Sequence, residues 1–159
     1  MKMKNWLGFI LTVLLISSAL FLQWFEHLKP CPLCIMQRLA FIAIALLFLI
    51  FALLPSRIWL ARLQGLLLMC VSGSGFAIAV RQVYLQHLPP GQAPSCGPGL
   101  SYLFDALPWH QALAMILQGS GECAVVDWRF LGLSMAAWSA LWLLFFFGYS
   151  LFIISKKTL

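Results

Sequence analysis

The chain has 159 residues, of which 63% are hydrophobic and only 9% are charged. Ordinary globular domains carry about 25% charged residues, and a water-soluble fold of this length could not bury so much apolar surface. The formal net charge of +6 does not indicate nucleic-acid binding, because the ten basic residues are scattered singly or in pairs at the ends of apolar runs. Basic residues in such places extend their charged ends to the membrane surface, and their distribution determines the orientation of the spans. We therefore expect one membrane domain covering residues 1–159 in a lipid bilayer.

Four apolar runs reach the length of about 20 residues that a helix needs to cross a bilayer. They cover residues 6–25, 33–54, 58–80 and 130–154. Because backbone hydrogen bonds must close within lipid, each run predicts a helix, and together they predict an all-α, four-transmembrane-helix bundle. The first run also resembles a signal peptide with a cleavage site near Ala19, but its apolar residues continue to Phe25, which favours a retained span.

The basic residues predict the orientation of these spans. With four crossings, one side of the membrane receives six of them: Lys2, Lys4, Arg57, Arg62, Lys156 and Lys157. The other side receives Lys29, Arg38, Arg81 and Arg129. The excess predicts that both termini are cytoplasmic, and that the loops at residues 26–32 and 81–129 face outward.

The long outward loop contains one segment with helical periodicity. Between Pro108 and Gly119, apolar residues recur at helical spacing: Trp109, Leu113, Ile116 and Leu117. Proline at the first turn and glycine just past the end are typical helix boundaries. We expect a short extracytoplasmic amphipathic helix lying on the membrane surface. The alternative is a loop segment packed against the bundle.

The predicted topology places four of the five cysteines on the outward side. Cys31 and Cys34 stand where the second span begins, and Cys96 and Cys123 lie in the long loop. Cys70 lies inside the third span, where a lone thiol is usually an inert small apolar residue. Cysteines in an oxidising compartment commonly form structural disulfides, so one interpretation is that the four outward cysteines form two disulfide bonds that only stabilise the fold.

The sequence Cys31-Pro32-Leu33-Cys34 favours redox chemistry instead. A C-x-x-C pair closes too small a ring to restrict the unfolded chain much. Cys34 would lie in the first turn of a helix, where free N–H groups and the helix dipole stabilise a thiolate. Arg38 follows four residues later on the same helix face. It could stabilise that thiolate, hold an anionic oxygen of an electron acceptor, or only anchor the helix at the interface.

The second pair of cysteines has a different setting. Cys96 and Cys123 both lie in glycine-rich stretches, so a disulfide joining them would be open to attack by the thiolate of another protein. A four-cysteine zinc site fits less well, because this pair lacks the second C-x-x-C that such sites usually show. We therefore expect no metal. The three histidines are widely spread and indicate interface or loop positions: His27, His87 and His110.

Nearly the whole chain resembles the disulfide bond formation protein B (DsbB) family. The most specific match is Lys29-Pro30-Cys31-Pro32-Leu33-Cys34 with Arg38 four residues on. Gly121-Glu122-Cys123, Trp128 and Phe130-Leu131-Gly132-Leu133 are also similar to the family. The resemblance implies a thiol:quinone oxidoreductase of the bacterial inner membrane that sustains disulfide bond formation in periplasmic proteins.

The resemblance also implies a role for each outward cysteine. Cys96 would form a mixed disulfide with a periplasmic DsbA-like protein of thioredoxin fold, which reduces a Cys96–Cys123 bridge. Cys31 and Cys34 would re-oxidise that pair and pass two electrons to a membrane quinone, ubiquinone or menaquinone, bound near Cys34 and Arg38. Many relatives carry an acidic residue before this arginine and a histidine near the end of the third span. This chain has Gln37 and Gln82 at those places.

Overall fold

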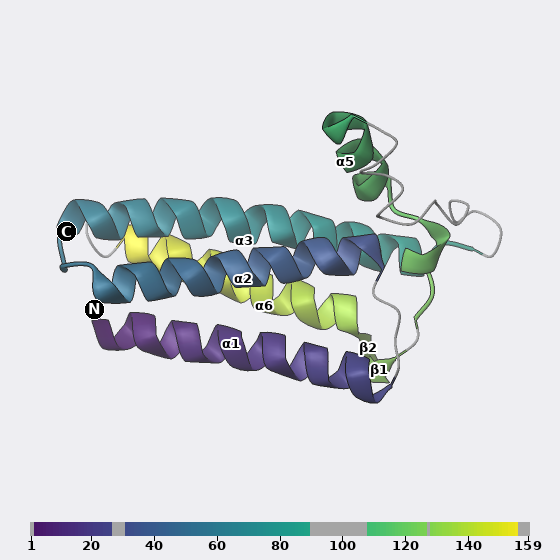
Figure 1. The fold of residues 1–159 in the computed structure, drawn as a ribbon, viewed down its shortest axis with the longest axis horizontal. Coiled ribbons are helices and arrows are strands. Elements are labelled where there is room, and N and C mark those ends of the chain that lie inside the picture. The colour runs from purple at the N-terminus through teal and green to yellow at the C-terminus, as the bar shows by residue number, and fades with distance from the viewer. Residues whose placement is uncertain (1, 27–30, 90–107, 127, 156–159) are drawn as a thin grey trace.

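The computed structural model describes residues 2–26, 31–89, 108–126 and 128–155. Four of its helices are long and apolar enough to cross a membrane: α1 (Lys2–Phe25), α2 (Pro32–Leu53), α3 (Ile58–Gln86) and α6 (Met135–Ser155). They lie side by side, and the start of α1, the α2–α3 turn and the end of α6 share one end of the bundle (Figure 1). The predicted all-α membrane bundle is confirmed.

The smaller elements all gather at the opposite end of the bundle (Figure 1). They are the helix α5 (Trp109–Gln118), the 3-10 turn η1 (Gly121–Cys123) and a hairpin of β1 (Arg129–Phe130) and β2 (Leu133–Ser134). This end also carries the start of α2, and with it the C-x-x-C sequence. We call it the cysteine end.

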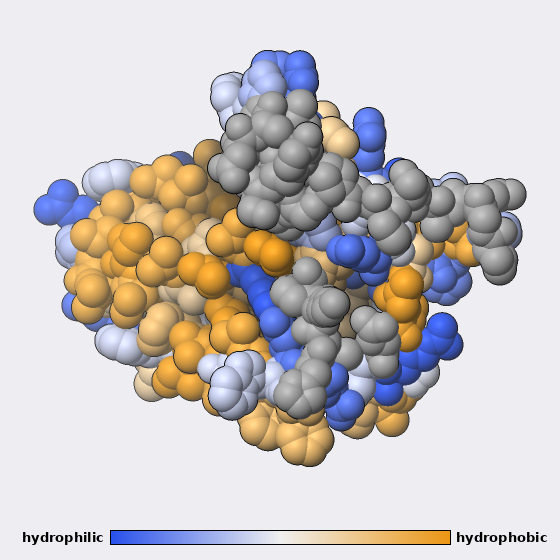
Figure 2. Space-filling model, turned by 45° about the vertical axis from the view of Figure 1, so that its right-hand side comes forward, coloured by the Kyte–Doolittle hydropathy of each residue, from blue (hydrophilic) through white to orange (hydrophobic). Residues whose placement is uncertain are grey.

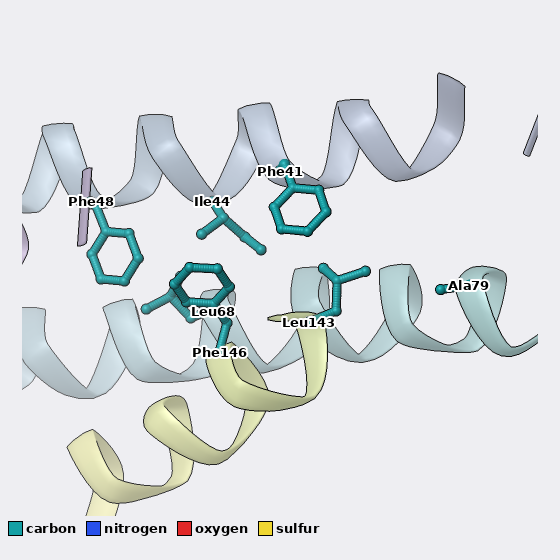
Figure 3. Close-up of a cluster of buried hydrophobic side chains, with 7 residues drawn as sticks. All are labelled: Phe41, Ile44, Phe48, Leu68, Ala79, Leu143 and Phe146. Carbon is teal, nitrogen blue, oxygen red and sulfur yellow. The ribbon is translucent and has the colours of Figure 1, made fainter. Parts of the chain in front are cut away.

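The helices pack in a chain of pairs. α1 packs on α2, α2 on α3, and α3 most extensively on α6. Figure 3 shows the shared core, in which three α2 side chains meet residues of α3 and α6: Phe41, Ile44, Phe48, Leu68, Ala79, Leu143 and Phe146. Gly75 lets α3 approach closely, since a Cβ there would lie 3.0 Å from Ala40 and 3.1 Å from Leu143. Such close packing, rather than escape from water, holds helices together in lipid.

The outer surface of the bundle is apolar. Large aliphatic and aromatic side chains are exposed along α1, α2, α3 and α6. Figure 2 shows these orange residues over much of the helical part, with hydrophilic residues more frequent toward the cysteine end. An apolar surface of this extent is suited to acyl chains and not to water.

At the cysteine end, the boundaries of α3 and α6 differ from the sequence prediction by several residues. α3 continues to Gln86, so Arg81 and Gln82 lie in the helix and not in the loop. The prediction that the fourth span begins at Phe130 is wrong, because α6 begins at Met135. Leu131 (φ 52°) and Gly132 (φ 80°) form a two-residue turn that pairs Phe130 with Leu133. Two successive positive φ angles are typical of a type I′ hairpin turn and cannot belong to a helix.

The predicted amphipathic helix is present as α5. Ala112 and Ile116 are buried and pack against Met36 of α2, whereas Trp109 is 75% exposed. The guanidinium of Arg81 donates a hydrogen bond to the carbonyl oxygen of Gln118 (3.2 Å), which satisfies one of the free carbonyls at the end of α5. α5 therefore packs on the bundle along one face and exposes further apolar residues on another.

Candidate redox site

The C-x-x-C pair lies at the first turn of α2. Cys31 is the N-cap residue, Pro32 occupies the first helical position, and the Cys34 amide donates to the Cys31 sulfur at 3.4 Å. Proline is pre-organised for that position. The two sulfur atoms lie 2.9 Å apart and both residues are free thiols. A disulfide needs a separation of about 2.05 Å, so the pair can form and break its bond with little movement of the helix.

A glutamine of α3 contacts both sulfurs. Nε2 of Gln82 lies 3.0 Å from the Cys34 sulfur and 3.3 Å from that of Cys31. Its Oε1 accepts a hydrogen bond of 2.7 Å from Nε2 of Gln37 on α2. Both glutamine side chains are buried. The redox pair is thus tied to α3 by polar contacts in a largely apolar bundle.

Cys123 joins this pair from the other loop. It is 1% exposed and belongs to one buried cluster with Cys31, Leu33 and Leu85. Its sulfur is hydrogen-bonded to the Cys31 thiol and accepts from the Leu33 amide in the first turn of α2. Gly119 allows this approach, because it has φ +80° and a Cβ there would overlap the Leu85 side chain. Three sulfurs from two distant segments therefore meet at one helix N-terminus.

Hydrogen bonding within this group divides the thiols into donors and acceptors. Donation from Cys31 lowers the pKa of Cys123 to about 6, against an opposing effect of burial. Hydrogen bonds that the Cys31 thiol donates to Cys123 and, to a smaller extent, to Cys34 raise the pKa of Cys31. The Cys31 proton is therefore retained while the Cys123 sulfur is held as thiolate, which is the nucleophilic form.

A cavity of about 250 Å³ opens beside Cys34. Cys34, Gln37, Arg38 and Phe41 of α2 line one wall. α1 contributes Leu15, Ile16, Ser18, Ala19 and Leu22, and α6 contributes Met135, Ala136, Trp138, Ser139 and Trp142. Arg38 is half-buried here and makes no ion pair with any residue that the structure describes. A desolvated cation without a counter-ion favours a ligand with an electronegative oxygen.

The β1–β2 hairpin forms the remaining wall of the cavity. Trp128 stacks on Phe130, whose ring lies 6.2 Å from that of Trp138, and both Trp128 and Phe130 line the cavity. The Trp138 indole N–H donates to the Phe130 carbonyl oxygen at 3.2 Å and fixes the hairpin on α6. Aromatic side chains of the hairpin and α6 therefore form one side of the cavity, and Cys34, Gln37 and Arg38 of α2 form another.

The structure places Cys31 in contact with Cys34 and Cys123, and it places Cys34 and Arg38 in the lining of one cavity. Cys96 and His27 lie outside the described residues, and so does the predicted Cys96–Cys123 bridge. Cys70 is exposed on α3, twelve residues before Gln82, or about 18 Å along the helix axis. His87 and His110 are exposed, at the end of α3 and on α5 respectively.

Sequence reasoning missed the aromatic walls and the contribution of the glutamines. Trp138 and Trp142 gave no signal, because aromatic residues are common in membrane spans. Gln37 and Gln82 were noted only as departures from a family pattern. A buried polar residue in an apolar helix is itself a sign of function, and that signal was present at both positions.

Comparison with known proteins identifies the family. Residues 2–153 match the family model described as "Disulfide bond formation protein DsbB". Curated proteins named "Disulfide bond formation protein B" are similar over most of their length. The protein of Methylococcus capsulatus is 47% identical over 83% of this chain and 80% of its own. That of Nitrosococcus oceani is 43% identical (87% and 82%), and that of Acinetobacter baumannii 45% (89% and 88%). The chain therefore belongs to the DsbB family of membrane oxidoreductases for disulfide bond formation.

Proposed function

We propose that the protein is a thiol:quinone oxidoreductase that re-oxidises a periplasmic DsbA-like dithiol and passes the electrons to a membrane quinone. One observation carries the proposal. Cys34 lies in the wall of an aromatic cavity with Arg38, while its neighbour Cys31 contacts Cys123 of the other loop. The sulfurs therefore form a path from the long loop to a cavity within the membrane-spanning part.

The first exchange takes place between proteins. A thiolate of the reduced partner attacks Cys96 in a Cys96–Cys123 disulfide, and Cys123 leaves as a thiolate. The partner's second thiol then attacks the mixed disulfide, so the partner leaves oxidised and Cys96 is released. The Leu33 amide in the first turn of α2 donates a hydrogen bond to the Cys123 sulfur and lowers its pKa, which makes this sulfur a better leaving group.

The second exchange takes place within the chain. The Cys123 thiolate attacks Cys31 in a Cys31–Cys34 disulfide, and Cys34 leaves as a thiolate beside the Gln82 amide. Cys96 then attacks Cys123, which re-forms the outer disulfide and releases Cys31. The contact between Cys31 and Cys123 supports this order, because exchange requires attack directly on a sulfur.

The residues of the cavity fit a quinone. A cavity of about 150 Å³ accommodates benzene, so the space of about 250 Å³ is suited to a substituted ring. Aromatic side chains form part of its walls, and the Arg38 guanidinium can donate a hydrogen bond to a carbonyl oxygen of the quinone. A bound quinone would take up the two electrons and two protons that Cys31 and Cys34 lose on forming their disulfide. Cys34 and Arg38 are the residues that would contact it.

The proposed location is the bacterial inner membrane. The basic residues at both termini and at the α2–α3 turn would then face the cytoplasm. The cysteine end would face the periplasm, where the partner is found.

The proposal is tested with purified protein, reduced DsbA-like partner and a soluble ubiquinone analogue. We expect quinone-dependent oxidation of the partner that is abolished by Ala at Cys31, Cys34, Cys96 or Cys123. Cys70→Ala is the matched control and should keep full activity. Catalysis that needed Cys70, or that proceeded without quinone or oxygen, would contradict the proposal.

The partner is identified by trapping. In cells, the Cys96 thiolate of Cys123→Ala should attack the disulfide of an oxidised thioredoxin-fold protein and form a mixed disulfide, with one partner thiol released. This adduct should accumulate on non-reducing gels, because Cys123 is not available to displace the partner from Cys96. The same adduct should disappear when Cys96 is also replaced by Ala. An adduct that survives the double substitution would show that another cysteine receives the partner.

A further inference from the structure

Two buried glutamines connect the cavity to the redox-active sulfurs. Gln37 and Gln82 are each 3% exposed, in helices whose residues are mostly apolar. Gln37 lines the cavity, whereas Gln82 does not. Gln82 instead directs its amide nitrogen at the sulfurs of Cys34 (3.0 Å) and Cys31 (3.3 Å).

The Gln37 contact determines which end of the Gln82 amide faces the sulfurs. An amide has a donating NH₂ end and an accepting oxygen end. The Gln82 oxygen accepts from the Gln37 NH₂ group at 2.7 Å, so the Gln82 NH₂ group faces the cysteines. Donors favour a thiolate, whereas an oxygen in the same place would accept from the thiol and favour the protonated form.

From these contacts we propose that Gln82 is a positioning residue that holds the Cys34 sulfur as a thiolate, and that Gln37 fixes the Gln82 amide in its donating orientation. The inference rests on the proposed function, in which Cys34 is the sulfur nearest the electron acceptor. Neither amide titrates, so the donation is present at any pH at which the fold is intact.

The other groups that act on Cys34 are few. Among the described residues, the ionisable groups beside it are Cys31 before α2, Arg38 one turn further along α2, and Cys123 of η1. The residues that α1 and α6 contribute to the cavity carry no ionisable group. From α3, only the uncharged Gln82 reaches this sulfur. A change in Cys34 reactivity on replacing Gln82 can therefore be assigned to the lost amide.

The experiment measures the reactivity of Cys34 without quinone or partner. Reduced protein in a Cys70→Ala background is alkylated with iodoacetamide at several pH values, and Cys34 is followed by mass spectrometry. In Gln82→Met we expect the alkylation rate of Cys34 at neutral pH to fall about tenfold, because a hydrogen bond to a charged group is lost. The pH midpoint should move upward. Gln37→Met should act in the same direction but less, because Gln82 is retained.

Gln64→Met is the matched control. Gln64 is also buried in α3 and pairs with an amide on another helix, Asn5 of α1, but far from the sulfurs. We expect Cys34 of this variant to react like that of the parent. If Gln82→Met leaves the rate unchanged, or if Gln64→Met slows it equally, the inference is wrong and the glutamines are only packing contacts.

A turnover measurement separates this inference from the proposed function. With partner and quinone, Gln82→Met should lower kcat by about tenfold and leave KM for quinone unchanged, because Gln82 does not line the cavity. Slower alkylation in a protein that does not reduce quinone would contradict the proposed function and leave the Gln82 inference standing. Normal alkylation in a variant of an active quinone reductase would contradict the inference alone.

Discussion

Arg38 is the residue whose replacement should separate quinone chemistry from disulfide exchange. It lies one turn after Cys34, half-buried in the cavity wall. A guanidinium placed before the reaction stabilises negative charge that develops on a nearby oxygen. We expect Arg38→Met to raise the KM for quinone, or to lower kcat, by about tenfold, which corresponds to about 1.4 kcal/mol. Steady-state kinetics at varied quinone concentration measures this effect.

The control for Arg38 is a single turnover without quinone. Disulfide exchange with the reduced partner should keep its normal rate in Arg38→Met. In quinone kinetics, Arg38→Lys should fall between the parent and Arg38→Met, because lysine keeps the positive charge but loses the planar guanidinium that can donate two parallel hydrogen bonds. Unaltered quinone kinetics in a normally inserted Arg38→Met protein would show that the arginine only anchors α2 at the interface.

Cys31 should control the protonation of Cys123 in the reduced protein. The Cys31 thiol donates to the Cys123 sulfur and lowers its pKa to about 6. Without this donor, in Cys31→Ala, the pKa of Cys123 should rise by about one unit or more. A lowered pKa means that thiolate is lost only as pH falls through about 6, so the variant should lose it at higher pH. The rate of Cys123 alkylation as a function of pH measures this midpoint. An unchanged midpoint in Cys31→Ala would show that Cys31 is not the donor that lowers the pKa of Cys123.

Part of the site can be predicted at the level of residues. Cys31, Cys34 and Arg38 share one helix turn, so their spacing in the sequence already places them together. Cys123 could be included only through the family resemblance, because nothing local indicates that it packs on α2. The Gln37–Gln82 hydrogen bond joins residues of two helices. It depends on the rotation of α2 against α3, which periodicity does not determine.

Gly119 should be required for the segment of residues 119–123 to place Cys123 beside Cys31. Alanine there must adopt φ +80° and also place a Cβ into the Leu85 side chain. We expect Gly119→Ala to weaken docking of η1 and to slow exchange between Cys123 and Cys31 at least several-fold, because attack needs close approach. Quenched-flow trapping of the rearranged disulfides would follow this step.

Gly132 offers a matched control for Gly119. It has the same φ of +80°, but a Cβ there would have nothing within 4 Å. Gly132→Ala therefore carries only the backbone strain, about 1–2 kcal/mol, and should leave Cys123–Cys31 exchange intact. Equal slowing in both variants would mean that glycine is needed for its φ angle and not for the close passage beside Leu85.

The elements themselves were predicted with unequal success. Length and apolar composition are enough to find α1 and α2, since lipid requires closed backbone hydrogen bonding. They fail at the start of α6, because Phe130 and Leu133 continue the apolar run although they belong to a hairpin. The signal for the turn is Leu131-Gly132, and a leucine at φ 52° is not expected from its preferences. Packing of this hairpin on Trp138 supplies the missing stabilisation.

Both ends of the whole chain should lie in the cytoplasm. α1 begins and α6 ends at the same end of the bundle as the α2–α3 turn (Figure 1), where the basic residues are in excess. Fusion of green fluorescent protein after Leu159 should therefore give fluorescent cells, and fusion of alkaline phosphatase there should be inactive. The same phosphatase inserted in the long loop should be active. The opposite pattern would place the cysteine end in the cytoplasm.

The order of helix contacts could not be predicted from composition. All four spans are apolar over most of their surface, so hydropathy alone does not show which helices are neighbours. A small residue such as Gly75 is suited to close packing, but the sequence does not identify its partners, which are Ala40 and Leu143. The position of the cavity follows from that order, and it too appears only in the structure.

The packing order leaves α1 and α6 in little contact with each other, each held instead by α2 or α3. The cavity lies between them, lined by α1, α2, α6 and the hairpin, with no residue of α3 among those described. Under the proposed function, an acceptor with a long isoprenoid tail would arrive sideways from the lipid, and its mole fraction in the bilayer would govern occupancy. The rate at which secreted proteins form disulfide bonds would then depend on the ratio of oxidised to reduced quinone in the respiratory membrane.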